Sequence, residues 1–72
     1  MKTQNLSLAE KAGKNLKNLI KQSQYRTQDN FAYELGTDPS TVRRWIHSGI
    51  NNINTIKQIA DFLDVDFLEL LK

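Results

Sequence analysis

The chain has 72 residues, a net charge of +2 at neutral pH and no cysteine. This length allows one domain with one small hydrophobic core. The absence of cysteine excludes a disulfide framework and a thiolate metal site, and a single histidine leaves no plausible zinc site. The N-terminal part lacks the apolar segment of a signal peptide, and no apolar run approaches the roughly 18 residues that span a bilayer. These features predict a cytoplasmic protein without a membrane partner.

Charge is distributed unevenly along the chain. Residues 1–50 carry eight basic and four acidic side chains, whereas residues 51–72 carry two basic and four acidic ones. A basic N-terminal part suits a polyanionic partner, but it suits an ordinary solvated surface equally well. The charge pattern alone therefore leaves the partner open.

Apolar side chains recur every three or four residues, which is typical of helices packed on one core. For the first helix, at about residues 8–23, the expected inward stripe is Leu8, Ala12, Leu16, Leu19 and Ile20. The lysines at positions 11, 14, 17 and 21 occupy its other faces and are interpreted as a solvated surface, with an electrostatic stripe for phosphates as the alternative. Residues 1–7 are expected to form a loose tail before this helix.

In the middle of the chain one helix stops and another starts within three residues. Thr27 is a suitable N-cap for the second helix, and Gly36 ends it because glycine adopts the left-handed conformation at low cost. Asp38 and Pro39 then begin the third helix, as a preferred N-cap followed by a residue that fits the first helical position. Gly49 ends the third helix. Two helices joined by so tight a turn cross steeply, and the second of them protrudes from the surface.

Two further helices complete the prediction. Asn51 and Asn52 offer a turn and a cap for the fourth helix, whose expected inward residues are Ile53, Ile56, Ile59, Ala60 and Leu63. No stretch alternates apolar and polar residues for long enough to predict a strand. The sequence therefore predicts a single all-α domain, a compact five-helix bundle.

The last segment, residues 66–72, is rich in apolar side chains. We expect Leu68 and Leu71 to close the core, which leaves Phe67 and Leu70 as a patch for a second copy of the chain. A monomer that tucks Phe67 under the first helix is nearly as well supported.

The third helix carries two adjacent arginines near its start. Val42, Trp45 and Ile46 share its inward face, so Ser40, Arg43 and Arg44 lie on the outer ones. A protruding helix matches the width of the DNA major groove, and the arginine fork can donate two hydrogen bonds to guanine. The sequence thus predicts base reading by these three residues.

Four motifs occur in order: "TQDNFAYELG", "STVRRW", "SG" and "IKQIADFLDVDFLELL". In their order and spacing, over about residues 13–71, the sequence resembles the Cro/CI-type (XRE family) helix-turn-helix repressors. The resemblance implies a lambda-repressor-like fold with the helix-turn-helix at about residues 27–47. It also implies a transcriptional repressor that binds a palindromic operator in double-stranded DNA as a homodimer.

The resemblance further implies roles for single residues. Ser40, Arg43 and Arg44 match positions that commonly face base edges. The side chains assigned to the DNA backbone are Arg26, Gln28, Thr37 and His47. Because the lysines of the first helix are interpreted as solvated, Lys17→Ala is expected to leave specific affinity within about twofold.

Two other interpretations stay open. One is that the chain is the DNA-binding head of a larger regulator. The other is a protein-interaction module of the antitoxin or antirepressor type, which would use the acidic C-terminal end with Phe67 and Leu70. An enzyme is not expected, because no constellation of titratable side chains supports one. No cofactor, metal or small-molecule ligand is implied.

Overall fold

The computed structural model describes residues 7–72, and in that range the chain forms five helices and no strand. The helices are α1 (Leu8–Gln22), α2 (Gln28–Leu35), α3 (Pro39–Ser48), α4 (Ile53–Leu63) and α5 (Leu68–Leu71). The predicted all-α class is confirmed. Within the described range, no helix has the length and apolar character needed to cross a membrane.

The N-terminus of α1 corrects the extent of the predicted tail. Residues 1–6 lie outside the described residues, but Ser7 belongs to the helix as its N-cap. The Ser7 hydroxyl accepts a hydrogen bond from the backbone N–H of Glu10, and the Glu10 carboxylate accepts one from the backbone N–H of Ser7. This reciprocal pair satisfies two N–H groups that the helix itself leaves without partners.

The caps of α2 and α3 form as the sequence predicts. Thr27 Oγ1 accepts a hydrogen bond from the backbone N–H of Asn30 at 3.1 Å, and Asp38 Oδ1 accepts one from that of Thr41 at 3.0 Å. Pro39 occupies the first turn of α3, where it costs no hydrogen bond. Both helices therefore begin at a capping side chain that lies three residues before the N–H group it binds.

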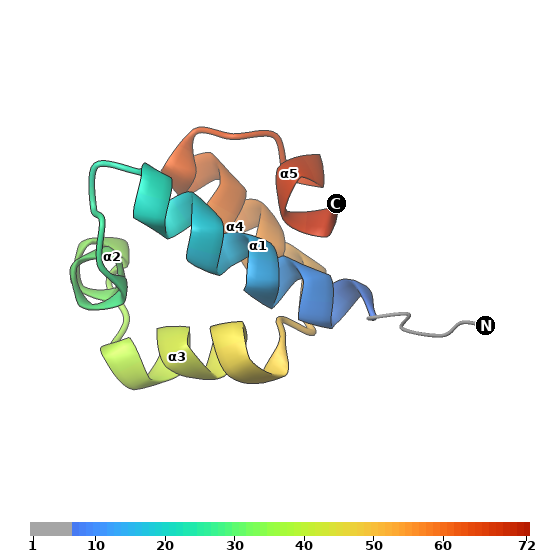
Figure 1. Ribbon diagram of the computed structural model, residues 1–72, viewed down its shortest axis with the longest axis horizontal. Helices are drawn as coiled ribbons and strands as arrows, with labels where there is room; N and C mark the ends of the chain where they lie inside the picture. The colour runs from blue at the N-terminus through green and yellow to red at the C-terminus, as the bar shows by residue number, and fades with distance from the viewer. Residues whose placement is uncertain (1–6) are drawn as a thin grey trace.

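The turn between α2 and α3 depends on one left-handed residue. Gly36 has a φ of 92°, and its N–H and that of Thr37 donate back to the carbonyl oxygens of Tyr33 and Ala32. This is a Schellman closure, which ends the helix and reverses the chain at once. Figure 1 shows the result: α2 is seen end-on while α3 runs across the view, so the two helices cross steeply.

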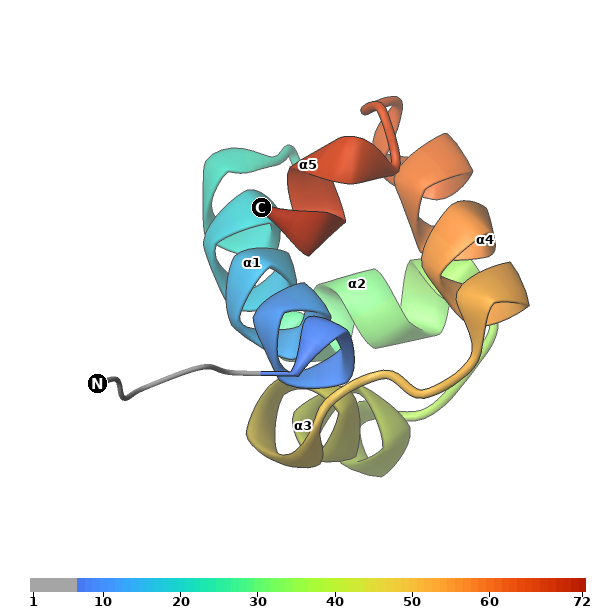
Figure 2. The same ribbon diagram turned by 90° about the vertical axis from the view of Figure 1, so that its right-hand side faces the viewer.

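Helix α1 contacts each of the other four helices. In Figure 1 and in the perpendicular view of Figure 2, α3 lies along one side of α1 and α5 along the other, and α1 contacts both of them. The buried side chains come from all five helices and the α3–α4 loop, and are those of Ala12, Leu16, Ile20, Phe31, Ala32, Val42, Ile50, Ile56, Ile59, Ala60 and Leu70. One core therefore joins the helix-turn-helix to the rest of the chain.

The α1–α2 loop is anchored by an aromatic cluster. Tyr25 stacks on Phe62 of α4 with ring centroids 5.2 Å apart and meets Phe31 of α2 edge-on at 5.9 Å. Phe31 is fully buried and also meets Phe62 edge-on. Burial of a side chain of this size stabilises the fold by about 1.5–3 kcal/mol, and edge-on pairing adds to that.

Two glycines allow α1 and α3 to approach backbone to backbone. A Cβ atom at Gly13 of α1 would fall on the carbonyl oxygen of Trp45 and lie 3.2 Å from that of Ile46. At the end of α3, Gly49 has a φ of 103°, and a Cβ atom there would lie 2.8 Å from the carbonyl oxygen of Ala9. That same oxygen accepts a hydrogen bond from the N–H of Ile50 at 3.0 Å. The distance between α1 and α3 is thus set by main-chain contact.

Two residues expected to point inward are exposed. Leu8 is 61% exposed and Ile53 is 52% exposed, although the following members of each stripe are buried or half-buried. Each is the first residue of its helix. At these two helix starts the apolar stripe is therefore left largely uncovered by residues 7–72.

The expectation for α5 is wrong about which leucine faces the core. Leu70 is fully buried, whereas Leu68 is 55% exposed. The half-buried Phe67 and Leu71 pack against the core, and Asn15 Nδ2 of α1 donates a hydrogen bond to the carbonyl oxygen of Leu70 at 2.8 Å. The proposed patch of Phe67 and Leu70 is therefore not a surface that a second copy could use, and Phe67 takes the alternative place in the core.

Replacing Gly13 with alanine is expected to lower the free energy of unfolding by about 1–3 kcal/mol, because the new Cβ atom overlaps the Trp45 carbonyl. In a helix without such a neighbour, the same change would stabilise by about 1 kcal/mol. Urea denaturation shows whether the free energy of unfolding falls, as the overlap predicts, or rises, as in a helix without such a neighbour. The exposed neighbour Lys14→Ala is the control and should change stability by less than about 0.5 kcal/mol.

Replacing Asp64 with glycine is expected to raise the free energy of unfolding by about 1 kcal/mol. Asp64 ends α4 with a φ of 58°, a left-handed conformation that strains most side chains, and its carboxylate lies at the negative end of the helix dipole. Asp64→Ala removes the charge and keeps the Cβ atom, so thermal denaturation should show a smaller gain for alanine than for glycine. Equal gains would mean that the backbone at this position carries no strain.

Candidate nucleic-acid interface

The outer face of α3 is the part of the molecule where the predicted base-reading residues gather. Ser40, Arg43, Arg44 and His47 are all exposed and recur at helical spacing along this face. They line one hollow with residues of α1 and α2, which we call the α3 hollow: Lys17, Gln28, Ser40, Arg43, Arg44, Ile46, His47 and Ser48. The structure thus brings Ser40, Arg43 and Arg44 together with two of the residues assigned to the DNA backbone.

The opposite face of α3 packs against the core, which explains why the face that carries the arginines points outward. Val42 is fully buried, and Trp45 and Ile46 are half-buried and pack against the core. The interpretation of Trp45 as a core residue is therefore confirmed. With Val42 and Trp45 held inward, the arginines lie on the outer side of α3, and the half-buried Ile46 lies at the boundary between the core and the α3 hollow.

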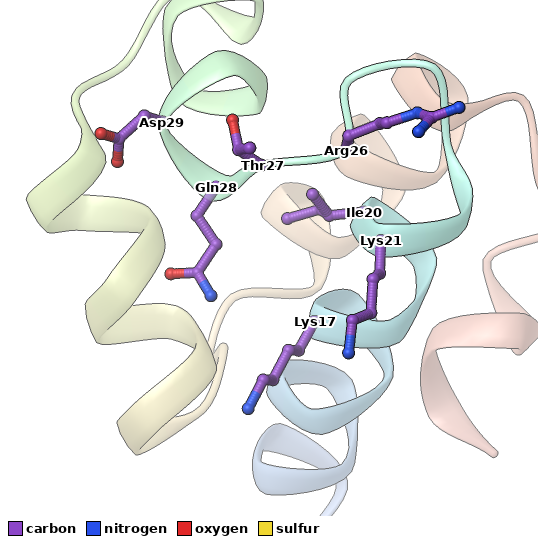
Figure 3. A pocket seen from close by; sticks show the side chains of 7 residues that line it. All are labelled: Lys17, Ile20, Lys21, Arg26, Thr27, Gln28 and Asp29. Atoms are coloured by element: carbon purple, nitrogen blue, oxygen red, sulfur yellow. The ribbon is translucent and has the colours of Figure 1, made fainter.

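A second hollow lies between α1 and the start of α2 (Figure 3). We call it the α1–α2 hollow, and its lining residues are Lys17, Ile20, Lys21, Arg26, Thr27, Gln28 and Asp29. In Figure 3 the side chains of Lys17 and Lys21 extend from α1 in the same direction, and the Gln28 amide extends from α2 toward the space beside them. Lys17 and Gln28 line both hollows, so the two form a continuous surface.

Lys17 and Lys21 line this surface, although the preferred interpretation of the sequence gave them a solvated face. Both are exposed, four residues apart, on the side of α1 that borders α2. The spacing of these two lysines is visible in the sequence. The sequence does not show which lysine-bearing face of α1 lies next to Gln28.

Two residues assigned to the DNA backbone lie apart from the α3 hollow. Arg26 lines only the α1–α2 hollow, and in Figure 3 its guanidinium points away from Gln28 and the two lysines. It adopts a left-handed φ of 65° in the loop before α2. Thr37 is half-buried in the turn, where its N–H is already bonded to Ala32.

The charges around the two hollows are mostly positive. The cationic side chains that line them are Lys17, Lys21, Arg26, Arg43 and Arg44, and the acidic one is Asp29. Asp29 Oδ1 lies 3.6 Å from Nη1 of Arg43, and both side chains are about 60% exposed. Arg44 makes no ion pair within residues 7–72. The surface therefore carries an excess of positive charge that water can reach.

These side chains are mainly hydrogen-bond donors suited to anionic or acceptor-rich partners. Lysine and arginine can only donate, and the Gln28 amide and the Ser40 hydroxyl can both donate and accept. Within residues 7–72, no group of three histidine, cysteine or acidic residues is placed to hold a metal ion. The chemistry that the arrangement supports is the binding of phosphates and of base edges.

The chain matches no protein-family model, no curated protein and no solved structure. The likeness to Cro/CI-type repressors therefore rests on the sequence motifs over about residues 13–71. What the structure adds is independent of that likeness: five helices, a tight turn that forms as predicted, and an outward face of α3 that carries two arginines.

Proposed function

We propose that this protein is a sequence-specific double-stranded DNA-binding regulator of the Cro/CI helix-turn-helix type, acting as a transcriptional repressor. One observation carries the proposal. Gln28 of α2 and Ser40, Arg43, Arg44 and His47 of α3, which the sequence predicts to contact DNA, line one exposed hollow. A protruding helix with such side chains fits a major groove about 12 Å wide.

In this proposal the two arginines and the two lysines have different tasks. Arg43 and Arg44 donate to base edges in the major groove, where guanine offers two acceptors to one guanidinium. Lys17 and Lys21, with the Gln28 amide, hold a phosphate beside the groove. Phosphate contacts fix the register of the protein on DNA, and base contacts supply the sequence preference.

We further propose that two copies of the chain bind a palindromic operator. A single helix of the length of α3 reads only a few base pairs, which is too short to specify a site. Two-fold symmetry doubles the length of the site. The half-sites should then lie about one helical turn, or ~10 base pairs, apart.

Selection of bound DNA from a random pool tests the proposal. The expected result is a palindromic motif with half-sites about 10 base pairs apart, bound with an affinity that falls as salt rises. The variant with both Arg43 and Arg44 replaced by alanine is the matched control and should select no motif. If the wild-type protein also selects none, the proposal is wrong, and a protein-interaction module becomes the better interpretation of the fold.

Replacing Arg44 with alanine is expected to cost ~1–3 kcal/mol of binding free energy on the selected site and to relax the preference at one base pair. Lys57→Ala is the control, since Lys57 is an exposed residue of α4 outside both hollows and its loss changes the net charge equally. Titration of labelled DNA measures both variants. An equal loss on random DNA would show that Arg44 contacts a phosphate and reads no base.

Replacing Lys17 with alanine is expected to weaken binding to selected and random DNA alike and to reduce the slope of log affinity against log salt by about 1. This expectation replaces the smaller effect predicted from sequence, because Lys17 lies beside Gln28 and lines both hollows. Lys14→Ala removes the same charge from an exposed position of α1 outside them. A Lys17 variant that behaves like the Lys14 variant would restore the solvated-surface interpretation.

A further inference from the structure

One ion pair links the two helices of the helix-turn-helix. Asp29 Oδ1, in the first turn of α2, lies 3.6 Å from Nη1 of Arg43 in α3. The other ion pair within residues 7–72 joins Lys72 to Glu69 at the end of the chain. The Asp29–Arg43 pair is therefore the charged contact that bears on the outer face of α3.

The position of Asp29 follows from the cap of α2. Thr27 holds the first turn, so the Asp29 side chain leaves α2 on the side toward α3, away from Lys17 and Lys21 (Figure 3). The other carboxylate near the turn, that of Asp38, is used to cap α3 by accepting from the N–H and the hydroxyl of Thr41. Asp29 is thus the acid that faces a proposed base-reading side chain.

The pair contributes little to the stability of the fold. Both side chains are about 60% exposed, and water and salt screen an exposed ion pair strongly. The ion pair instead affects the orientation of the Arg43 guanidinium. A guanidinium carries five N–H donors in one rigid plane, so a carboxylate on one edge restricts the directions in which the other edge can donate.

A restricted arginine discriminates better between bases than a free one. A free side chain can swing to a phosphate, or to acceptors of a neighbouring base pair, whereas the attraction of Asp29 favours the orientations that keep one end of the Arg43 guanidinium near the carboxylate. The carboxylate also repels phosphates, which weakens binding to every DNA sequence. The restriction of Arg43 raises the ratio of specific to non-specific affinity, the quantity that decides occupancy of one site among many, whereas the repulsion lowers both affinities alike.

We propose that Asp29 is a positioning residue that sets sequence specificity, because it orients Arg43 toward one base pair. This inference rests on the proposed function and assigns the control of its specificity to a residue of α2. Asp29 itself touches no base in this scheme and acts through the guanidinium of Arg43.

The test compares Asp29→Asn with Glu34→Gln. Both remove one negative charge from an exposed position of α2, but Glu34 makes no ion pair within the described residues. Arg43→Ala first identifies the base pair that Arg43 reads. Each protein is then titrated with the selected site, with sites altered at that base pair, and with random DNA. Thermal denaturation confirms that all variants are folded, since the pair contributes little to stability.

The Asp29→Asn variant is expected to lose about three- to tenfold of the discrimination at the base pair read by Arg43. It should also bind random DNA about two- to threefold more tightly, since one repulsive charge is gone. Glu34→Gln should keep the wild-type discrimination. In the Arg43→Ala background, Asp29→Asn should change discrimination no further.

Three results would overturn the inference. Unchanged discrimination in Asp29→Asn would show that Asp29 acts only as a general charge, even if the proposed function holds. A further loss of discrimination in the Arg43→Ala background would show that Asp29 does not act through Arg43. Absence of any sequence preference in the wild-type protein would overturn the proposed function and this inference together.

Discussion

The main-chain contact between α1 and α3 is the constraint on which the rest of the structure depends. Gly13 lets the first helix lie against the carbonyl oxygens of Trp45 and Ile46, and Gly49 lets the end of α3 turn beneath Ala9. Contact between backbones is stiffer than contact between flexible side chains, because neither partner has a rotamer to change. The outer face of α3 therefore has a fixed position relative to α1, and so do the side chains of both helices.

That fixed position explains how one small core supports an exposed charged surface. The core lies under α3, where Val42 is buried and Trp45 packs against it, and the arginines are left outside. The same placement brings Lys17 of α1 and Gln28 of α2 to the edge of the α3 hollow. Three helices thus contribute side chains to one surface, each of them one or a few. The buried core that holds these helices in place lies behind that surface.

The wrong predictions for Leu8, Ile53 and the leucines of α5 have one physical cause. Helical periodicity gives the spacing of a stripe, but its phase and its ends depend on the neighbouring helices. Leu8 and Ile53 continue their stripes past the edge of the core. In the last segment, residues 67–71, four apolar residues lie within five positions, so periodicity could not choose between Leu68 and Leu70. The choice depends on how the segment meets α1, where Asn15 holds the carbonyl of Leu70.

The sequence by itself determined what local chemistry decides: the all-α class, the caps at Thr27 and Asp38, the left-handed turn at Gly36, and the outward face of the arginines. Each depends on residues within four or five positions of one another, so the pattern is readable along the chain. Only the tertiary structure showed that Gly13 is a contact point, that Lys17 borders Gln28, and that Asp29 meets Arg43. These depend on how far apart and at what angle the helices pack, and that geometry is set by the sum of all contacts in the core.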